Sequence, residues 1–164
     1  MKKNSVSKSN KFIPVNTPLI TSKDISSVNR VLKEGWISSV GPEISKFESK
    51  MAKFTKRKYA SCVSSGTAAL EIAIKALDIG KNDEVIMPSF TIASNAFAIL
   101  RNSAKPVLID SDLETWNIKT DEIEKKITRR TKAIMLPHIY GFPNDMDAIE
   151  KIIKKHKLFL IEDA

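Results

Sequence analysis

Apolar and polar positions follow two different periods along the chain, and the period changes near Tyr59. Before that residue, apolar side chains recur every three or four positions, which predicts amphipathic helices. The first helix follows the capping-box pattern Thr21–Asp24 and ends at Gly35. The second helix carries an apolar stripe, which we interpret as part of a core, at Ile44, Phe47, Met51 and Phe54.

From Tyr59 onward, short apolar runs alternate with helical patterns. The apolar runs predict strands at residues 59–63, 84–87, 107–109, 133–136 and 158–161. The helical patterns predict helices over residues 67–77 and 91–101, around Ile123 and Ile127, and from Met146 to Ile153. Continuous apolar strands separated by helices indicate an α/β fold with a mainly parallel sheet and helices on both faces.

The remaining composition narrows the class of protein. Residues 1–12 are polar and aperiodic, so we expect a disordered tail there and a folded domain over residues 13–164. No apolar run reaches the length of a membrane span, and the start lacks the apolar part of a signal peptide. A single cysteine, Cys62, suits the reducing cytoplasm, where we expect the protein to reside without a membrane partner. One cysteine and two histidines argue against a zinc site.

The formal net charge of +8 raises the question of a nucleic-acid partner. Lysines are spread along the predicted helices without the interleaved aromatic residues that a single-strand binding surface uses. We therefore interpret the charge as a solvated surface and expect no nucleic-acid partner. The positive field would favour an anionic small substrate.

Two polar segments are candidates for a binding site, and we expect the turn Pro88–Thr91 to meet them at the same edge of the sheet. The turn Ser64–Thr67 lies between an apolar run and a helix, where backbone N–H groups and hydroxyls can bind a phosphate. Plain helix capping by Ser65 and Thr67 is the alternative. At the other end of the chain, Glu162 and Asp163 follow the last apolar run, and the carboxyl ends of parallel strands meet at one edge of a sheet. We expect both segments to form one site, for a cofactor with a phosphate and a basic ring nitrogen.

Other chemistry is left open or disfavoured. The two carboxylates could also form a solvated strand end, a helix cap or a magnesium site, but the turn lacks the lysine of a nucleoside-triphosphate loop. The glycine patterns of dinucleotide sites and of serine-hydrolase elbows are missing from the sequence. His138 follows a predicted strand, and it is either a ligand residue or a loop histidine satisfied by the protein.

Six motifs in this order resemble a known family. They read GWISS from Gly35, VSSGTAAL from Val63, DEVI from Asp83, DSD with ETW from Asp110, HIYG from His138 and IEDA from Ile161. Together they are similar to the amino-terminal part of the DegT/DnrJ/StrS family of pyridoxal-phosphate-dependent nucleotide-sugar aminotransferases. The resemblance covers Ile13 to Ala164.

The resemblance implies the amino-terminal part of a type I aminotransferase large domain, working as a homodimer. Ser65, Gly66 and Thr67 would hold the phosphate of pyridoxal 5'-phosphate, and Asp163 would pair with its ring nitrogen. The family often stacks an aromatic residue on the cofactor ring; Ile92 takes that place here, so either Ile92 or Phe90 would pack on the ring. No metal is implied.

The implied reaction moves an amino group, from glutamate, onto a nucleotide-linked 4-keto sugar for cell-surface polysaccharide synthesis. GDP-4-keto-6-deoxymannose is one candidate substrate. The family's Schiff-base Lys is expected beyond Ala164, so we expect no catalytic residue in this chain and no activity from it alone. A related branch has His at that position and dehydrates the sugar. The alternative from another class is a non-catalytic α/β module that binds a phosphate ligand or a partner protein.

Overall fold

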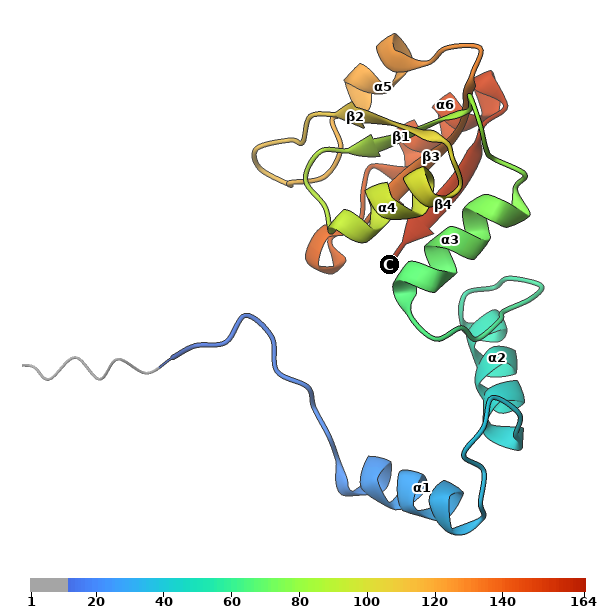
Figure 1. Ribbon diagram of the computed structural model, residues 1–164. Coiled ribbons are helices and arrows are strands. Elements are labelled where there is room, and N and C mark those ends of the chain that lie inside the picture. The colour runs from blue at the N-terminus through green and yellow to red at the C-terminus, as the bar shows by residue number, and fades with distance from the viewer. Residues whose placement is uncertain (1–11) are drawn as a thin grey trace, which may run out of the picture. The chain divides into compact units, whose positions relative to one another are not determined.

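The computed structural model describes residues 12–164, and the chain divides after Cys62 into two compact units (Figure 1). The predicted disordered tail, residues 1–12, lies outside the described residues except for Phe12. Across this part of the chain, no helix combines the length and the apolar character that crossing a bilayer requires.

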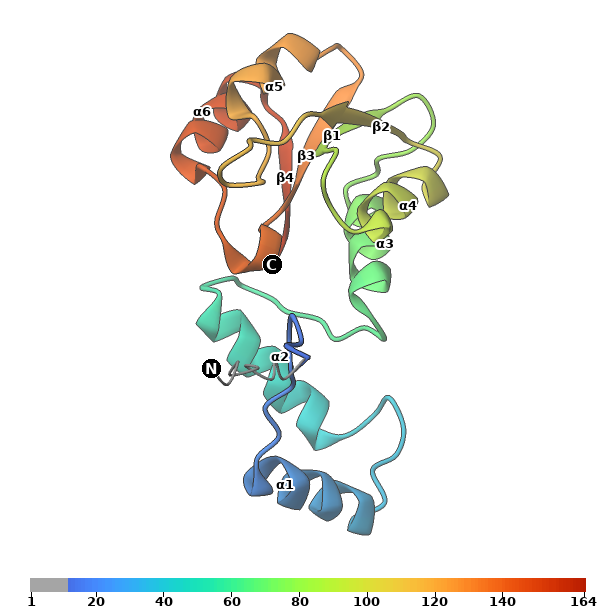
Figure 2. The same cartoon turned by 90° about the vertical axis from the view of Figure 1, so that its left-hand side faces the viewer.

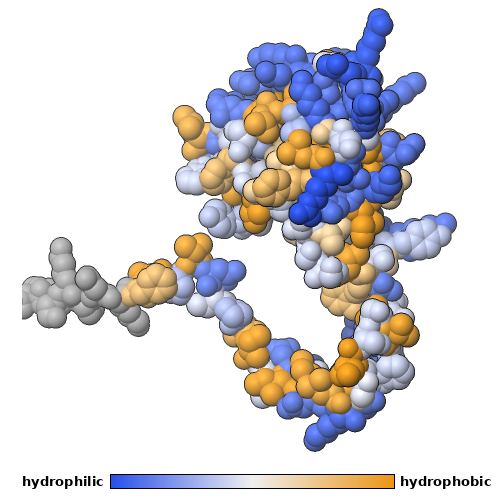
Figure 3. Space-filling view, in the orientation of Figure 1, coloured by the Kyte–Doolittle hydropathy of each residue, from blue (hydrophilic) through white to orange (hydrophobic). Residues whose placement is uncertain are grey.

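The first unit contains two helices, α1 (Ser22–Lys33) and α2 (Pro42–Phe54). The predicted capping box is confirmed: the Thr21 N–H donates to Asp24 Oδ2 at 2.8 Å, and the Asp24 N–H donates to Thr21 Oγ1 at 3.3 Å. No residue of either helix is buried, and apolar side chains gather on the surface of α1 (Figure 3). The prediction that the stripe of α2 belongs to a core is wrong here, because periodicity specifies which face is apolar and not what covers it.

The predicted strand at residues 59–63 is also wrong. Among residues 12–164, this segment pairs with no strand, and it therefore lacks the neighbouring backbone that defines one. The Cys62 N–H donates instead to Oε1 of Glu48, on α2, at 2.8 Å. Its apolar residues matched the pattern of a strand, but the pattern does not supply a pairing partner.

The second unit is a parallel sheet between two helical layers, as predicted (Figure 2). Its strands, in the spatial order β2-β1-β3-β4, are β1 (Glu84–Pro88), β2 (Lys105–Ile109), β3 (Thr131–Pro137) and β4 (Phe159–Asp163). Helices α3 (Gly66–Ala76) and α4 (Ala93–Arg101) cover one face, and α5 (Thr120–Lys126) and α6 (Met146–His156) cover the other. A short 3-10 helix, η1 (Ile139–Gly141), follows β3.

Alternation along the strands divides the buried side chains between two cores. Val85 and Met87 pack towards α3 and α4, whereas Ile86 between them packs towards α5 and α6. Each such buried side chain stabilises the fold by about 1.5–3 kcal/mol. On β4, Ile161 belongs to the α3/α4 core and Leu160 packs against the α5/α6 core. This alternation also decides where the side chains at the end of β4 point.

Candidate functional site

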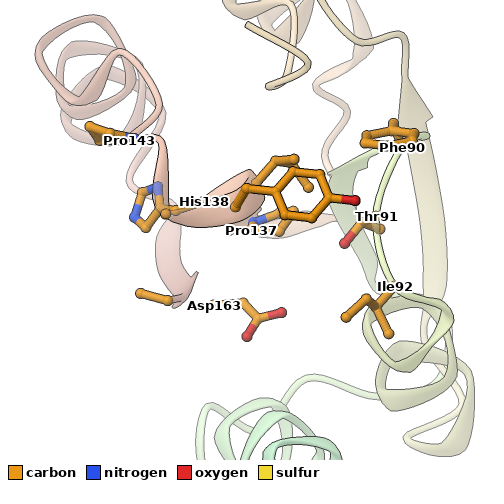
Figure 4. Close-up of a pocket in the computed structure, with 11 residues that line it drawn as sticks. Phe90, Thr91, Ile92, Pro137, His138, Pro143 and Asp163 are labelled. Atoms are coloured by element: carbon orange, nitrogen blue, oxygen red, sulfur yellow. The ribbon is translucent and has the colours of Figure 1, made fainter. Parts of the chain in front are cut away.

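A cavity of about 660 Å³ lies at the carboxyl edge of the sheet (Figure 4). Its lining comes from the turn after β1, the end of β3 with the loop that follows, and the end of β4. Chain segments that are far apart in sequence therefore converge where ligands bind to open parallel sheets. The lining is mostly apolar, with the polar side chains of Thr91, His138, Tyr140 and Asp163.

Strand β4 separates the two predicted carboxylates. The strand runs two residues further than predicted, so Glu162 and Asp163 both belong to it, and Asp163 pairs in register with Pro137. Asp163 shares its side of the sheet with Ile161, the α3/α4 side, and lines the cavity. Glu162 faces the other side, 3.5 Å from His138 Nε2. In the described part of the chain, no three His, Cys, Asp or Glu residues converge as metal ligands would.

The turn after β1 brings Thr91 and Ile92 to the cavity. Helix α4 begins at Ala93, two residues later than predicted, because Ile92 has an extended backbone with φ −68° and ψ 138°. The Thr91 hydroxyl donates to Asn95 Oδ1 at 3.3 Å. The side chain of Ile92, which is 74% exposed, borders the cavity (Figure 4). Ile92 is thus placed where an apolar contact with a bound ring is available.

Phe90, the other candidate for ring packing, already contacts an aromatic side chain. Its ring meets Trp116 edge-on, with 5.0 Å between centroids and 80° between planes. Asp112 shapes the turn before Trp116 by accepting hydrogen bonds from the N–H groups of Glu114 and Thr115 and from the Thr115 hydroxyl. These hydrogen bonds, led by the Thr115 N–H, hold the pKa of the Asp112 carboxyl below its ordinary value. Which side chain packs on a cofactor ring stays a prediction.

Helix α3 begins at the end of the unit where β4 finishes (Figures 1 and 2). Ser65 caps the helix, with Oγ accepting from the Ala68 N–H at 3.2 Å, so the capping role left open by the sequence is real. Among residues 12–164, no acceptor takes the N–H groups of Gly66 and Thr67, as is usual for the first turn of a helix. A Cβ built on Gly66 would meet no atom within 4 Å, so the approach to these donors is open.

The predicted site residues are therefore only partly brought together. Ile92 and Asp163 line one cavity, whereas Ser65, Gly66 and Thr67 lie outside its lining. The three nevertheless form the N-cap and the first two residues of α3, the helix that helps to cover the side of the sheet occupied by Asp163.

The loop after β3, residues 138–143, is hereafter the wall loop, because His138 and four of the residues after it line the cavity. Tyr140 adopts the left-handed conformation, with φ 50° and ψ 27°, and Gly141 has φ 80°. Hydrogen bonds hold this turn: Gly141 N–H donates to His138 O and Phe142 N–H donates to Ile139 O, each at 2.9 Å. A strained residue beside a cavity is a frequent functional feature.

The turn Pro88–Thr91 was expected at this edge of the sheet, and Thr91 lines the cavity. Sequence reasoning did not single out Tyr140 as a lining residue. Its place after the carboxyl end of a predicted strand was the available signal.

Known proteins are similar to this chain in sequence. The model of the "DegT/DnrJ/EryC1/StrS aminotransferase family" matches residues 18–164. GDP-perosamine synthase of Escherichia coli O157:H7 is 47% identical over 154 residues, covering 94% of this chain and 42% of that protein. The motifs had pointed to GDP-perosamine synthase among the family's members. The chain thus spans about two fifths of the length of this curated relative.

Solved structures agree in fold. The aminotransferase from Psychrobacter cryohalolentis superposes with a TM-score of 0.84 at 37% identity, covering 88% of this chain and 37% of that one. NtdA from Bacillus subtilis, with the cofactor PMP bound, gives 0.83 at 34% identity and covers 88% of this chain and 34% of its own. The predicted amino-terminal part of an aminotransferase large-domain fold is confirmed.

Proposed function

Because the chain belongs to the DegT/DnrJ/EryC1/StrS aminotransferase family, whose members depend on pyridoxal phosphate, we propose that it holds this cofactor for a nucleotide-sugar aminotransferase. One observation carries the proposal: Asp163 ends β4, beside the end of β3, and turns its carboxylate into an apolar cavity at the ligand edge of the sheet. A carboxylate in such a place suits a cationic ring nitrogen.

The donor set fits the cofactor. Asp163 would accept a hydrogen bond from the ring nitrogen and favour its protonated form, because an adjacent negative charge stabilises a cation. Ile92 would cover the ring with apolar surface. The N–H groups of Gly66 and Thr67, with the Ser65 and Thr67 hydroxyls, would bind the phosphate at the positive end of α3. The bound cofactor supplies an electron sink for amino-group transfer.

The wider assignment follows the relatives. We infer that the acceptor is a nucleotide-linked 4-keto sugar and the donor glutamate, with GDP-4-keto-6-deoxymannose as the candidate suggested by perosamine synthase. A cytoplasmic homodimer is part of the same proposal. We assign the Schiff-base lysine to no residue of this chain, so its own role is to bind and orient the cofactor, and we expect no transamination from it alone.

The test is a calorimetric titration of the 164-residue chain with pyridoxal phosphate, which measures the binding affinity. Asp163→Asn keeps the shape of the side chain and removes its charge. Losing a charge-assisted hydrogen bond should weaken binding about 10- to 100-fold. Asp147→Asn makes the same chemical change on the exposed first turn of α6 and should leave affinity unchanged.

Pyridoxal, which lacks the phosphate, separates the proposal from the phosphate-module alternative. Asp163→Asn should weaken pyridoxal binding as well, whereas Ser65→Ala should weaken only the phosphorylated form. A chain that binds inorganic phosphate and pyridoxal phosphate equally well, with or without Asp163, would be a phosphate-binding module, and the cofactor assignment would fail.

A further inference from the structure

His138 is connected to the end of β4 through its backbone. It follows β3 directly, and its N–H donates to the carbonyl of Asp163 at 3.0 Å, which continues the pairing of the two strands by one step. Its side chain lines the cavity but is only 11% exposed. His138, the first residue of the wall loop, therefore joins this loop to the strand that carries the proposed cofactor ligand.

The imidazole has a defined proton position. Nδ1 lies 3.2 Å from the backbone nitrogen of Asn144, and a backbone N–H can only donate, so Nδ1 is the acceptor and carries no proton. The ring proton then resides on Nε2, which is 3.5 Å from Glu162 Oε2. The ring is thus neutral and directed at Glu162.

Asn144 is itself fixed. It is 5% exposed, its Nδ2 donates to the carbonyl of Pro137 at 2.8 Å, and its Oδ1 accepts from the Ile118 N–H at 3.4 Å. Asn117 ties the same loop further along, with Nδ2 donating to the carbonyls of Phe142 and Pro143 at 3.0 and 3.1 Å. The group that orients the imidazole is therefore held by buried hydrogen bonds, not by a mobile side chain.

We propose that His138 is a positioning residue for Asp163. Its backbone fixes the Asp163 carbonyl, and its ring, oriented by Asn144, lies against Glu162 on the α5/α6 side of the sheet. Because neighbouring side chains of a strand point to opposite faces, holding Glu162 on that side holds the Asp163 carboxylate on the cavity side. The nature of the ligand in this inference rests on the proposed function; the tautomer and the fixed end of β4 do not.

Two variants separate the ring nitrogens. In His138→Asn, the amide oxygen takes the place of Nδ1 and can still accept from the Asn144 N–H. In His138→Gln, the side-chain amide reaches the place of Nε2, and the backbone N–H of Asn144 is left without an acceptor. The contact of Nδ1 with Asn144, at 3.2 Å, is shorter than the contact of Nε2 with Glu162, at 3.5 Å. We therefore expect His138→Asn to keep the position of Asp163 and His138→Gln to lose it.

The measurements are ¹H–¹⁵N spectra of the labelled 164-residue chain and its affinity for pyridoxal phosphate. Imidazole nitrogen shifts should identify the neutral Nε2–H tautomer. His138→Gln should shift the amide resonances of Asn144, Glu162 and Asp163 and weaken cofactor binding about tenfold, while His138→Asn stays within about threefold of the parent.

An Nδ1–H tautomer, or a His138→Gln chain whose Asp163 amide and affinity are unchanged, would overturn the positioning role. Equal losses in both variants would overturn it too, because a general structural defect would explain them. If the parent chain binds no pyridoxal phosphate, the proposed function fails, and the amide shifts alone decide the role of His138.

Discussion

At the residue scale, the cavity combines the carboxylate of Asp163 with an aliphatic side chain at position 92, where an aromatic residue would offer a ligand ring a larger flat surface. Ile92 borders it with an exposed aliphatic side chain, and Phe90 is engaged with Trp116. Stacked aromatic pairs add about 0.5–1.5 kcal/mol beyond the area they bury. A ligand ring bound beside Ile92 would gain area burial but not this additional term.

We therefore expect Ile92→Phe to tighten the binding of pyridoxal phosphate by about 2- to 10-fold. Equilibrium dialysis of the parent and variant chains measures the change. Ile37→Phe, at an exposed isoleucine of the first unit, is the matched control and should not alter affinity. Weaker binding by Ile92→Phe would show that the aliphatic side chain is fitted to the ligand and that an added ring obstructs it.

Sequence reasoning predicted the residues whose role follows from strand order and missed those whose role follows from backbone conformation. Asp163 was predicted because it follows an apolar run, whereas Ile92 was implied by the family resemblance, and both line the cavity. Tyr140 was missed because its place depends on a left-handed backbone, which no hydropathy pattern encodes. The ambiguity over His138 needed the contact with Asn144 to resolve it.

At the scale of elements, Ser65 at the start of α3 is both a helix cap that stabilises the fold and a candidate ligand for the phosphate. The Ser65 hydroxyl satisfies the Ala68 N–H, while the N–H groups just before it stay available. A capping serine normally contributes about 1 kcal/mol to stability. The same hydroxyl is a candidate phosphate ligand, so its two roles need separate measurements.

Ser65→Ala should lower the free energy of unfolding by about 1 kcal/mol in urea titrations, because the Ala68 N–H loses its acceptor. Ser65→Asn restores a side-chain oxygen at the cap and should recover most of that stability. No difference in stability between the serine and alanine chains would mean that the cap contributes nothing here.

Four of the five predicted strands were correct, and the failure has a physical cause. Residues 84–87, 107–109, 133–136 and 158–161 are apolar runs that lie side by side in one sheet. Residues 59–63 have a similar composition but lack a paired backbone in the part of the chain that the structure describes. The start of α4 and the end of β4 moved by two residues at the cavity, while β2 and β3 each begin two residues earlier than predicted, at the opposite edge of the sheet.

At the scale of the whole molecule, a buried carboxylate at the amino edge of the sheet joins several elements. Glu84 of β1 is 2% exposed; it accepts from the Thr128 hydroxyl at 2.6 Å and from Arg130 at 2.8 Å, and Lys105 of β2 lies 4.0 Å away. The Thr128 hydrogen bond, with Arg130 and Lys105, lowers the pKa of Glu84 despite the opposing effect of burial. The ionised carboxylate of Glu84 therefore stabilises the edge of the sheet opposite the cavity.

A pKa that is lower in the folded than in the unfolded state means that Glu84 stabilises the fold above the ordinary glutamate pKa of 4.5 and loses this contribution as the pH falls below it. Glu84→Gln should cost about 2 kcal/mol at pH 7, and the gap in stability to the parent should narrow as the pH falls below 4.5. Urea unfolding of the parent and Glu84→Gln chains, measured from pH 7 to below pH 4.5, tests this prediction.

Glu150→Gln, in an exposed pair with Lys154, is the control and should cause a much smaller change. A gap between the Glu84→Gln and parent chains that stays constant with pH would mean that the ionised form of Glu84 is not what stabilises the sheet.

The α/β class and the two-sided covering of the sheet were predictable because parallel strands buried on both faces leave a strong pattern. The exposed stripes of α1 and α2 were not, since periodicity reports an apolar face and says nothing of its cover. The hydropathy pattern therefore identified both helices correctly but led to a wrong prediction of burial for the stripe of α2.

The contact between Phe90 and Trp116 has a practical consequence. Phe90 lines the cavity and Trp116 packs on it, so an indole lies one side chain away from any bound molecule. The chain has two tryptophans, and Trp36 belongs to the other unit. A chain carrying Trp36→Phe would keep a single tryptophan, and its emission, excited at a wavelength that tyrosine does not absorb, would report whether the cavity is filled.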